Sequence, residues 1–436
     1  MNIYGIDLGT TNSLIGLHKE NFLSDIVPSC VDEKTGRAGA DYFEDMTADR
    51  SFKIDISMGV EGDMPRRASA CVLRELVNQV KSEKVTDVVI SVPAYFSDNQ
   101  RTATITAAEA AGLTVHSLVN EPTAAAMYIA NRKQGLYVIY DLGGGTFDCS
   151  IIDSRFGAFD VQATDGCKIG GDNFDMNIMR HFMKEGHVPI HKLDALKRMS
   201  LQHFASKKKI ELQKQRTNII VDLTPWGGSP ISFTVENYKA IMKTTFADTM
   251  TCMKKLLHAW IPSTEQYQIL LVGGSTHCPY LREWIEEETG RALEKLTYDP
   301  DRVVAQGAAL YADLVERGEV HMSVSDVTKQ LGIGLYDGTI EVLVPANSKI
   351  PLSMQKLLTN KIPASKLTLN LYQGTSLFTK DNEMIGELLY DYGGVRDAME
   401  GQVIVTISID GSGIIKLSAK ELLGKEQSIE LIRGKS

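Results

Sequence analysis

The chain has 436 residues, of which 43% are hydrophobic and 23% are charged, and its formal net charge is −9. This length is too great for one ordinary hydrophobic core and predicts two or three domains, while the composition excludes a disordered chain. The negative charge argues against a nucleic-acid-binding protein, whose domain normally carries a basic face. The net charge does not exclude a local basic groove.

The six cysteines are scattered without a C-x-x-C pair, which indicates free thiols rather than a zinc site or a disulfide framework. The chain starts "MNIYGIDLG", where no signal peptide fits, and no apolar run approaches membrane-spanning length. A cytoplasmic protein without a membrane partner is therefore expected.

Strands and helices are expected in alternation through most of the chain. An apolar strand, a turn and a second strand are predicted over residues 2–17, and residues 22–65 are irregular and turn-rich. In the helix predicted over 97–112, Ser97 and Gln100 have capping-box spacing and Gly112 stands where the helix would end. The other predicted elements are a helix over 68–83, a strand over 87–96, a strand over 116–119, a helix over 120–132, a strand, turn and strand over 136–155, and a strand, Gly-Gly turn and helix over 268–288.

The pattern changes after about Val320, where helical periodicity stops and short alternating strands with Gly, Asn and Asp turns begin. A separate all-β domain is predicted there. The stretch "GEVHMSVSD", residues 318–326, lies between the two patterns and is the candidate linker.

Two hairpins of similar outline carry the chemistry. "DLGGGTFD", residues 141–148, has three glycines between two carboxylates, and "DLGTTNS", residues 7–13, repeats the pattern with threonines. Glycines let backbone N–H groups approach an anion closely and let φ become positive. Since carboxylates alone would repel phosphate, the pattern predicts a cation between the two, most simply hydrated Mg²⁺.

An ordinary β-hairpin with a glycine turn is the alternative for each motif alone. A third turn, "LVGGST" at 271–276, is expected to open a helix whose N-terminus favours anions. The standard phosphate loop, G-x-x-x-x-G-K-[ST], is absent from the sequence. The three turns together predict a two-sided phosphate clamp on a different nucleotide-binding fold.

The order of these motifs resembles the actin-like ATPase superfamily. "GIDLGTTNS", "VVISVPAYFSDNQR", "LVNEPTAAAMYIA", "YDLGGGTFD", "IGGDNFD", "LVGGST" and "YDPDRVVAQGAAL" resemble the seventy-kilodalton heat-shock chaperones of the DnaK type. "LGIGLYDG", "LVPANSKIP", "LYQG" and "IDGSGIIKLSAKELLGKEQ" are similar to that family's β-sandwich peptide-binding subdomain. The resemblance implies a nucleotide-binding α/β domain of two duplicated lobes over 1–320, a linker over 321–326 and a β-sandwich over 327–436.

The resemblance also implies a set of site residues. The family's pattern gives ATP or ADP with Mg²⁺, and K⁺, as cofactors, and phosphoryl transfer by positioning and charge neutralisation. The metal would be held, largely through water, by Asp7, Asp141 and Asp148. The catalytic set is Asp7, Lys53, Glu121, Asp141, Thr146 and Asp148. The nucleotide would be bound by Gly9, Thr10, Thr11, Asn12, Gly143, Gly144, Gly145, Gly170, Gly171, Lys209, Gly273, Gly274, Ser275, His277 and Asp301.

Alternatives stay open for single residues in these sets. Lys53 could be a solvated surface lysine, and Glu121 could stabilise a helix N-terminus. Pro93 and Arg101 resemble the family's relay towards the linker, together with Asp326, but Pro93 could simply end a strand. The peptide cleft implied by the resemblance is lined by Ile333, Tyr336, Leu358, Leu367 and Leu369, each of which could instead be a core residue.

Four departures from the family's pattern mark a divergent member. His277 stands at a position where many members stack an Arg on adenine, and Ser206 stands where a Glu usually contacts adenosine. The linker "VHMSVSD" lacks the usual leucines, so coupling of the two domains is in doubt. The stretch from Leu17 to Pro93 is short, which implies one reduced upper lobe. No helical lid follows the β subdomain, so a lidless form like the HscC branch is expected.

An ATP-dependent chaperone of extended apolar peptides, with slow ATPase turnover, is the function that these features favour. A J-domain co-chaperone is an expected partner, whereas the reduced lobe leaves an exchange factor in question. An ATP-binding regulatory or scaffold protein with weak turnover is the alternative that the sequence does not separate. A small-molecule kinase or an actin-type filament protein would have no use for the β domain.

Overall fold

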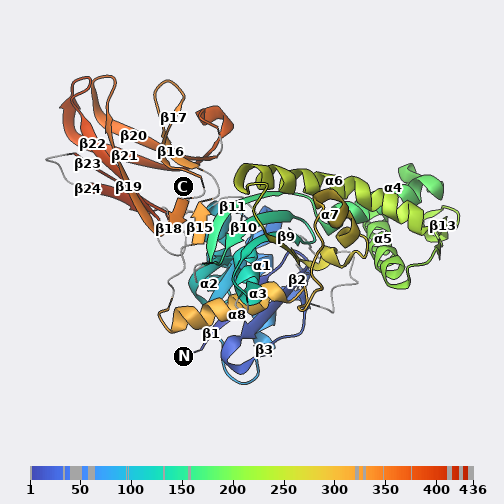
Figure 1. The fold of residues 1–436 in the computed structure, drawn as a ribbon. Coiled ribbons are helices and arrows are strands. Elements are labelled where there is room, and N and C mark those ends of the chain that lie inside the picture. Colours follow the sequence, from blue (N-terminus) through green and yellow to red (C-terminus); the bar gives the residue numbers. More distant parts are fainter. Residues whose placement is uncertain are drawn as a thin grey trace.

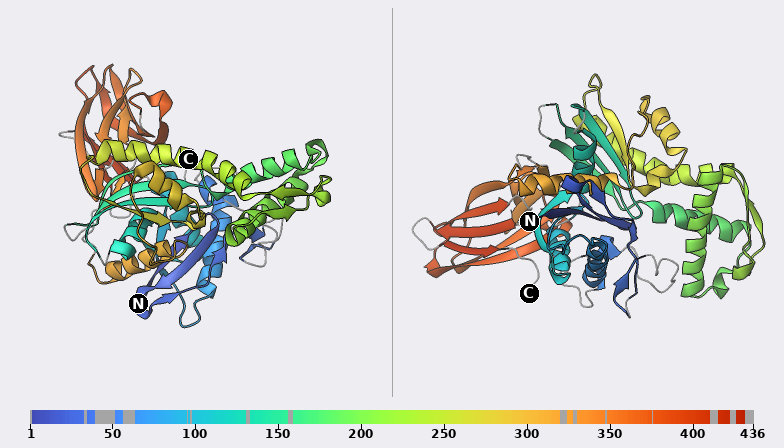
Figure 2. Two further views of the ribbon diagram at one scale, coloured as in Figure 1. Left: turned by 45° about the vertical axis from the view of Figure 1, so that its right-hand side comes forward. Right: turned by 90° about the horizontal axis from the view of Figure 1, so that it is seen from below.

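We describe a computed structural model of residues 2–32, 35–39, 52–56, 64–94, 96, 98–130, 133–155, 159–319, 324–327, 330–346, 348–374, 376–409, 415–421 and 426–430. An α/β part is followed by an all-β part, and Figure 1 shows the C-terminal sheets to one side of the α/β part. Both views in Figure 2 place these sheets at the opposite end of the molecule from helices α4 and α5. No helix in the described ranges is long and apolar enough to cross a membrane.

The first sheet has six strands in the order β3-β2-β1-β7-β8, with β4 pairing with β2. Its strands are β1 (Ile3–Leu8), β2 (Asn12–Leu17), β3 (Phe22–Leu23), β4 (Val27–Pro28), β7 (Asp87–Val92) and β8 (Thr114–Asn120). The accompanying elements are the pair β5 (Val31–Asp32) and β6 (Arg37–Ala38), turns η1 (His18–Glu20) and η3 (Phe52–Asp55), and helices α1 (Met64–Asn78), α2 (Asp98–Ala110) and α3 (Glu121–Ala130).

The second sheet has four strands in the order β11-β10-β9-β14. Its strands are β9 (Leu136–Leu142), β10 (Phe147–Asp153), β11 (Asp160–Cys167) and β14 (Gln268–Val272). Around it lie α4 (Gly171–Glu185), η4 (Ile190–Lys192), α5 (Ala195–Gln215), β12 (Ile219–Val221), η5 (Thr224–Trp226), β13 (Ile231–Phe233), α6 (Val235–Trp260), η6 (Gly274–His277), α7 (Leu281–Thr289) and α8 (Val303–Glu316).

The two sheets repeat one arrangement. In each, a strand pairs antiparallel with the next strand through a glycine turn, β1 with β2 and β9 with β10. The same strand then pairs in parallel with a later one, β1 with β7 and β9 with β14. These parallel strands are buried on both faces and are therefore almost continuously apolar, as the sequence pattern predicted.

Helices α3 and α8 pack between the two sheets. Their buried side chains share one core cluster with residues of both sheets, among them Val89 of β7 and Ile139 of β9. Contact is close because the helices are rich in Ala and Gly: a Cβ on Gly307 would lie 1.8 Å from the carbonyl oxygen of Ala124. A Cβ on Gly5 would lie 2.1 Å from the backbone N of Ala309. These contacts fix α3 and β1 relative to one another.

The C-terminal part is a sandwich of two four-stranded antiparallel sheets. One sheet has the order β17-β16-β20-β21 and the other β19-β22-β23-β24, and buried side chains of both form a single core. The strands of these sheets are β16 (Gln330–Gly334), β17 (Ile340–Val344), β19 (Leu352–Thr359), β20 (Ala364–Gly374), β21 (Glu383–Arg396), β22 (Gln402–Ile409), β23 (Ile415–Glu421) and β24 (Glu426–Glu430), with turn η7 (Thr379–Asp381). A separate two-stranded sheet is formed by β15 (Val324–Val327) and β18 (Ser348–Ile350).

Three expectations need correction. The turn-rich region after residue 22 contains the short strands β3 to β6 and the turn η3. The turn at Gly273 and Gly274 does not open a helix directly, because the 3-10 turn η6 intervenes before α7. Residues 324–327 of the expected linker form β15, which pairs antiparallel with β18. Ser97 of the expected capping box and residues 321–323 of the linker lie outside the described residues.

We expect Gly307→Ala to lower the free energy of unfolding by about 1–3 kcal/mol, because the new methyl group must displace the backbone of α3. Gly394→Ala is the matched control, since its methyl group would come no closer than 3.7 Å to Arg396 Nη1. The measurement is the midpoint of denaturant unfolding of the full chain. Equal losses in the two variants would contradict the close helix crossing.

Candidate functional site

The two glycine hairpins meet at their tips. A Cβ on Gly144 would lie 1.9 Å from the Thr11 hydroxyl oxygen, so the backbone of one hairpin touches a side chain of the other. None of Gly143, Gly144 and Gly145 has a positive φ, which corrects the expectation that the run serves backbone freedom. At Gly144, the missing side chain is required by the close approach of the hairpins.

Two buried serines shape the first hairpin. The Gly9 N–H donates to Ser13 Oγ at 3.1 Å, and the Ser29 hydroxyl donates to the Gly9 carbonyl at 2.7 Å. The Ser29 N–H also donates to the Thr11 carbonyl at 2.7 Å. Ser29 therefore anchors both sides of the turn that carries Thr10 and Thr11. Neither serine was predicted as a site residue. Ser13 lies inside the "DLGTTNS" motif and could have been recognised there, whereas Ser29 belongs to no motif.

The second hairpin is held by its own turn and by residues from two later segments. Its turn closes with a hydrogen bond from Gly143 N–H to the Thr146 carbonyl at 2.9 Å. The Gly171 N–H and the Ser275 hydroxyl both donate to the Gly143 carbonyl at 2.9 Å. A Cβ on Gly170 would lie 2.6 Å from the carbonyl carbon of Gly144. The expected phosphate-binding residues of this half are thus brought together around one turn.

Buried carboxylates gather below the hairpins. Burial, and after it the neighbouring Glu121 carboxylate, raise the pKa of Asp7 to about 7, while Lys53 opposes this shift. Burial, then Glu121, also holds the pKa values of Asp141 and Asp148 well above their ordinary range. Asp7 and Asp141 are the second-last residues of β1 and β9, Asp148 is the second residue of β10, and Glu121 begins α3. Both sheets therefore contribute to the group.

Lys53 is the cation that these four carboxylates share. Its side chain is buried and forms an ion pair with Glu121, which rules out the alternative of a solvated surface lysine. Its Nζ lies 5.9 Å from the centre of the Phe96 ring. One lysine cannot balance four carboxylates, and their charged forms are costly here unless protons or a further cation offset them.

The residues present fit a hydrated Mg²⁺ ion. Asp148 Oδ1 is buried and has no hydrogen-bond partner, so it is free to accept from a metal-bound water. The ligand atoms of Asp7, Asp141 and Asp148 do not all lie within 4.8 Å of one another, since the described residues hold only one such group and it lies elsewhere. Indirect binding through water, which Mg²⁺ favours, suits this spacing. Ser91 on β7 donates to Asp7 Oδ1 at 2.8 Å and orients that carboxylate.

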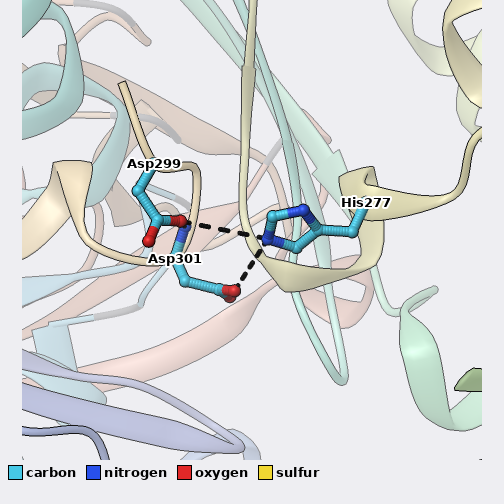
Figure 3. Close-up of side chains that lie close together, drawn as sticks. All are labelled: His277, Asp299 and Asp301. Atoms are coloured by element: carbon cyan, nitrogen blue, oxygen red, sulfur yellow. Dashed lines mark hydrogen bonds and ion pairs between the residues drawn. The ribbon is translucent and has the colours of Figure 1, made fainter. Parts of the chain in front are cut away.

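The expected adenosine-side residues lie around the turn after β14. Gly273 has φ +84°, and a Cβ there would lie 2.7 Å from Asp141 Oδ1, which joins this turn to the carboxylate cluster. A Cβ on Gly274 would lie 2.6 Å from Asp301 Oδ1. His277 Nε2 is 2.8 Å from Asp301 Oδ2, a hydrogen bond that raises the pKa of the imidazole (Figure 3).

Lys209 lies on the other side of this region. Its Nζ on α5 is 2.7 Å from Asp175 Oδ1 on α4, the helix that starts at Gly171. Asn12 begins β2 and pairs with Pro28, next to Thr11. All members of the predicted nucleotide set are among the described residues, in the segments around the two hairpins and the turn after β14.

The expected relay residues contact the carboxylate cluster through Asn120. Arg101 is buried on α2, and its Nη2 donates to Asn120 Oδ1 at 2.6 Å. Asn120 directly precedes Glu121. Arg101 Nε also donates to the Phe96 carbonyl at 3.4 Å, and the Phe96 N–H donates to the Pro93 carbonyl at 3.2 Å.

Described contacts join the α/β part to the all-β part. Asn99 Nδ2 on α2 donates to Glu383 Oε1 on β21 at 3.3 Å. Strand β15, which carries Asp326, contacts β11, the edge strand of the second sheet (Figure 1). Helix α2 therefore contacts the sandwich and, through Arg101, the neighbourhood of Glu121.

The expected cleft residues differ in exposure. Ile333 and Leu369 are only 1% exposed and belong to the sandwich core. Leu358 and Leu367 are partly buried and pack against that core. Tyr336 is 76% exposed in the turn between β16 and β17. A peptide could touch Tyr336 directly, but it could reach Ile333 and Leu369 only if the sandwich opened.

Asp148→Asn should raise the stability of the metal-free protein by about 1 kcal/mol, because a neutral amide relieves the repulsion among buried carboxylates. The measurement is thermal unfolding in EDTA and again with added MgCl₂, which should stabilise the wild type more than the variant. Asp248→Asn, at an exposed position on α6, is the control and should behave like the wild type. A destabilised Asp148→Asn in EDTA would argue against the charge analysis.

Comparison with known proteins shows the family of this chain. A family model described as "Hsp70 protein" matches residues 44–436. The "Chaperone protein DnaK" of Mycoplasmoides gallisepticum is 31% identical over 478 aligned positions, which cover 98% of this chain and 80% of that protein. The family match spans most of the chain, including Lys53, Glu121, Asp141 and Asp148. This chain therefore belongs to the Hsp70 family.

Proposed function

We propose that this protein is an ATP-dependent chaperone. Its α/β part, residues 1–320, would be an actin-like domain that binds and slowly hydrolyses ATP, and residues 327–436 would bind extended apolar peptides. The observation that carries the proposal is the buried group of four carboxylates and one lysine beneath two touching glycine hairpins. A triphosphate with its metal ion is the ligand class that suits such a site.

In this proposal, the two hairpins bind the phosphates and the carboxylates position the reaction. Backbone N–H groups at Thr10, Thr11, Gly144 and Gly145 would face the phosphate oxygens, while the Gly143 N–H closes the turn. Asp7, Asp141 and Asp148 would hold Mg²⁺ through water, and the ion would neutralise the charge that develops on the phosphates. Asp148 Oδ1, buried and unpartnered, would orient the attacking water.

Lys53 and Glu121 would sense the γ-phosphate. Lys53 is paired with Glu121 in the structure described here, and an arriving phosphate would compete for the lysine. A shift of Glu121 would move the neighbouring Asn120 and change its hydrogen bond with Arg101 on α2. The first turn of α2 contacts β21 of the sandwich. This chain of contacts supports a coupling between the two parts despite the polar linker.

The peptide would bind at the end of the sandwich that carries Tyr336. Main-chain hydrogen bonds to an extended peptide, with apolar side chains in pockets, are the mode that such strands support. A J-domain co-chaperone is a proposed partner, and a cytoplasmic location and K⁺ as a second cation belong to the same proposal. An ATP-binding scaffold with weak turnover is the second candidate, because Ile333 and Leu369 are closed off in this state.

Asp148→Asn should reduce ATP turnover at least about a hundredfold, since a neutral amide cannot take a proton from the attacking water. The experiment measures ATP hydrolysis with and without an extended apolar peptide, using the full chain, Asp148→Asn and the exposed control Asp248→Asn. Stimulation by peptide that disappears only in Asp148→Asn supports the chaperone cycle. Turnover that is indifferent to peptide in the wild type would favour the scaffold.

Tyr336→Ala should weaken the binding of an apolar peptide about tenfold, because an aromatic ring contributes about 150–250 Å² of contact area. The measurement is fluorescence anisotropy of a labelled peptide. Val395→Ala is the matched control, since Val395 is also exposed and lies on β21, and its affinity should equal that of the wild type. Unchanged binding in Tyr336→Ala would place the cleft elsewhere on the sandwich.

A further inference from the structure

One group of metal-ligating side chains lies outside the carboxylate cluster. His277, Asp299 and Asp301 each offer one ligand atom, and these atoms lie within 4.8 Å of one another. Figure 3 shows the imidazole pointing towards both carboxylates, with Nε2 facing them. No other trio of His, Cys, Asp or Glu in the described part of the chain meets this spacing.

The distances in this group are close to those of a coordination shell. A metal ion bonded to nitrogen and oxygen at about 2.0–2.2 Å separates its ligand atoms by roughly 3.0–3.6 Å. His277 Nε2 lies 2.8 Å from Asp301 Oδ2 and 3.9 Å from Asp299 Oδ1. Small side-chain rotations would therefore bring all three atoms to bonding distance of one ion.

The backbone around the group is held in place. Gly273 N–H donates to the Pro300 carbonyl at 3.1 Å, which joins the His277 turn to the loop that carries both aspartates. The Asp301 N–H donates to Asp299 Oδ1 at 3.0 Å. The group is thus assembled from two segments before any ion arrives, which lowers the entropic cost of binding.

The ligand types select the class of metal. One imidazole and two carboxylates suit a divalent transition-metal ion such as Zn²⁺, whereas Mg²⁺ and Ca²⁺ prefer sites made of oxygen alone. His277 and Asp299 are exposed, so water can complete the coordination shell. Arg302 Nε, 3.5 Å from Asp299 Oδ2, is the competing cation.

We propose that His277, Asp299 and Asp301 form a binding site for a divalent transition-metal ion, with Zn²⁺ as the ion best matched to the donors. The site is distinct from the Mg²⁺ cluster, but it shares His277 and Asp301 with the predicted nucleotide set, so it is tested on the nucleotide-free chain. The site lies beside the turn of Gly273 and Gly274. A bound ion would replace the hydrogen bond that now joins His277 to Asp301.

The test is calorimetric titration of the nucleotide-free full chain with Zn²⁺, in excess Mg²⁺ so that the oxygen-only cluster is occupied. We expect one equivalent to bind to the wild type, and His277→Gln and Asp299→Asn to weaken this binding at least about tenfold. His116→Gln is the matched control: His116 Nε2 lies 2.7 Å from Asp87 Oδ1, and His116 and Asp87 belong to no three-residue group of this spacing. Its Zn²⁺ affinity should equal that of the wild type.

Ring ¹⁵N spectra of the histidines supply a second readout. Zn²⁺ should shift the Nε2 resonance of His277 at one equivalent, before any other histidine responds. Absence of Zn²⁺ binding, equal losses in His277→Gln and His116→Gln, or an unshifted His277 resonance would show that the three residues form only an ion pair. Thermal unfolding confirms that each variant is folded.

Discussion

Buried negative charge is the constraint on which the rest of this structure depends. Four carboxylates share one place with a single buried lysine, and burial raises the pKa values of three of them. Such a group destabilises the folded chain by itself. The hydrophobic framework on both sides offsets this destabilisation, and a ligand that supplies positive charge would reduce it further.

The framework comes from small residues rather than large ones. Helices α3 and α8 approach each other at Gly307 and Ala124, and α8 approaches β1 at Gly5 and Ala309. Because α3 starts at Glu121 and Asp7 is the second-last residue of β1, this close packing sets the distance between two of the charged groups. Side chains of the same helices and of both sheets form one core cluster, so this shared core positions both glycine hairpins.

The charged group is also the place from which a signal could reach the sandwich. Glu121 follows Asn120, which accepts a hydrogen bond from the buried Arg101 on α2. The first turn of α2 also contacts Glu383 of the sandwich. Only a few polar contacts are involved, and none requires the leucine-rich linker that this chain lacks. A coupling carried by α2 would therefore depend on the nucleotide site more than on the linker composition.

Much of the fold was predictable from local pattern. The alternation of apolar strands and helices, the two related hairpins and the change to short strands after Val320 all correspond to observed elements. The short strands β3 to β6 and the 3-10 turn after Gly274 were not predicted, because runs of two to four residues have too little periodicity to be recognised. The burial of Ile333 and Leu369 could not be read from strands in which cleft and core residues look alike.

The sequence by itself determined the candidate groups for a phosphate site, because glycine turns and carboxylates near strand ends are local features of the chain. The tertiary structure alone decided which of them share a site. It showed that Lys53 is buried in an ion pair with Glu121 and that Ser29 donates a hydrogen bond to the first hairpin. It also showed that Ser91 donates a hydrogen bond to Asp7 and that His277 faces two aspartates. These partners are far apart along the chain, and their contacts arise from packing that no local pattern encodes.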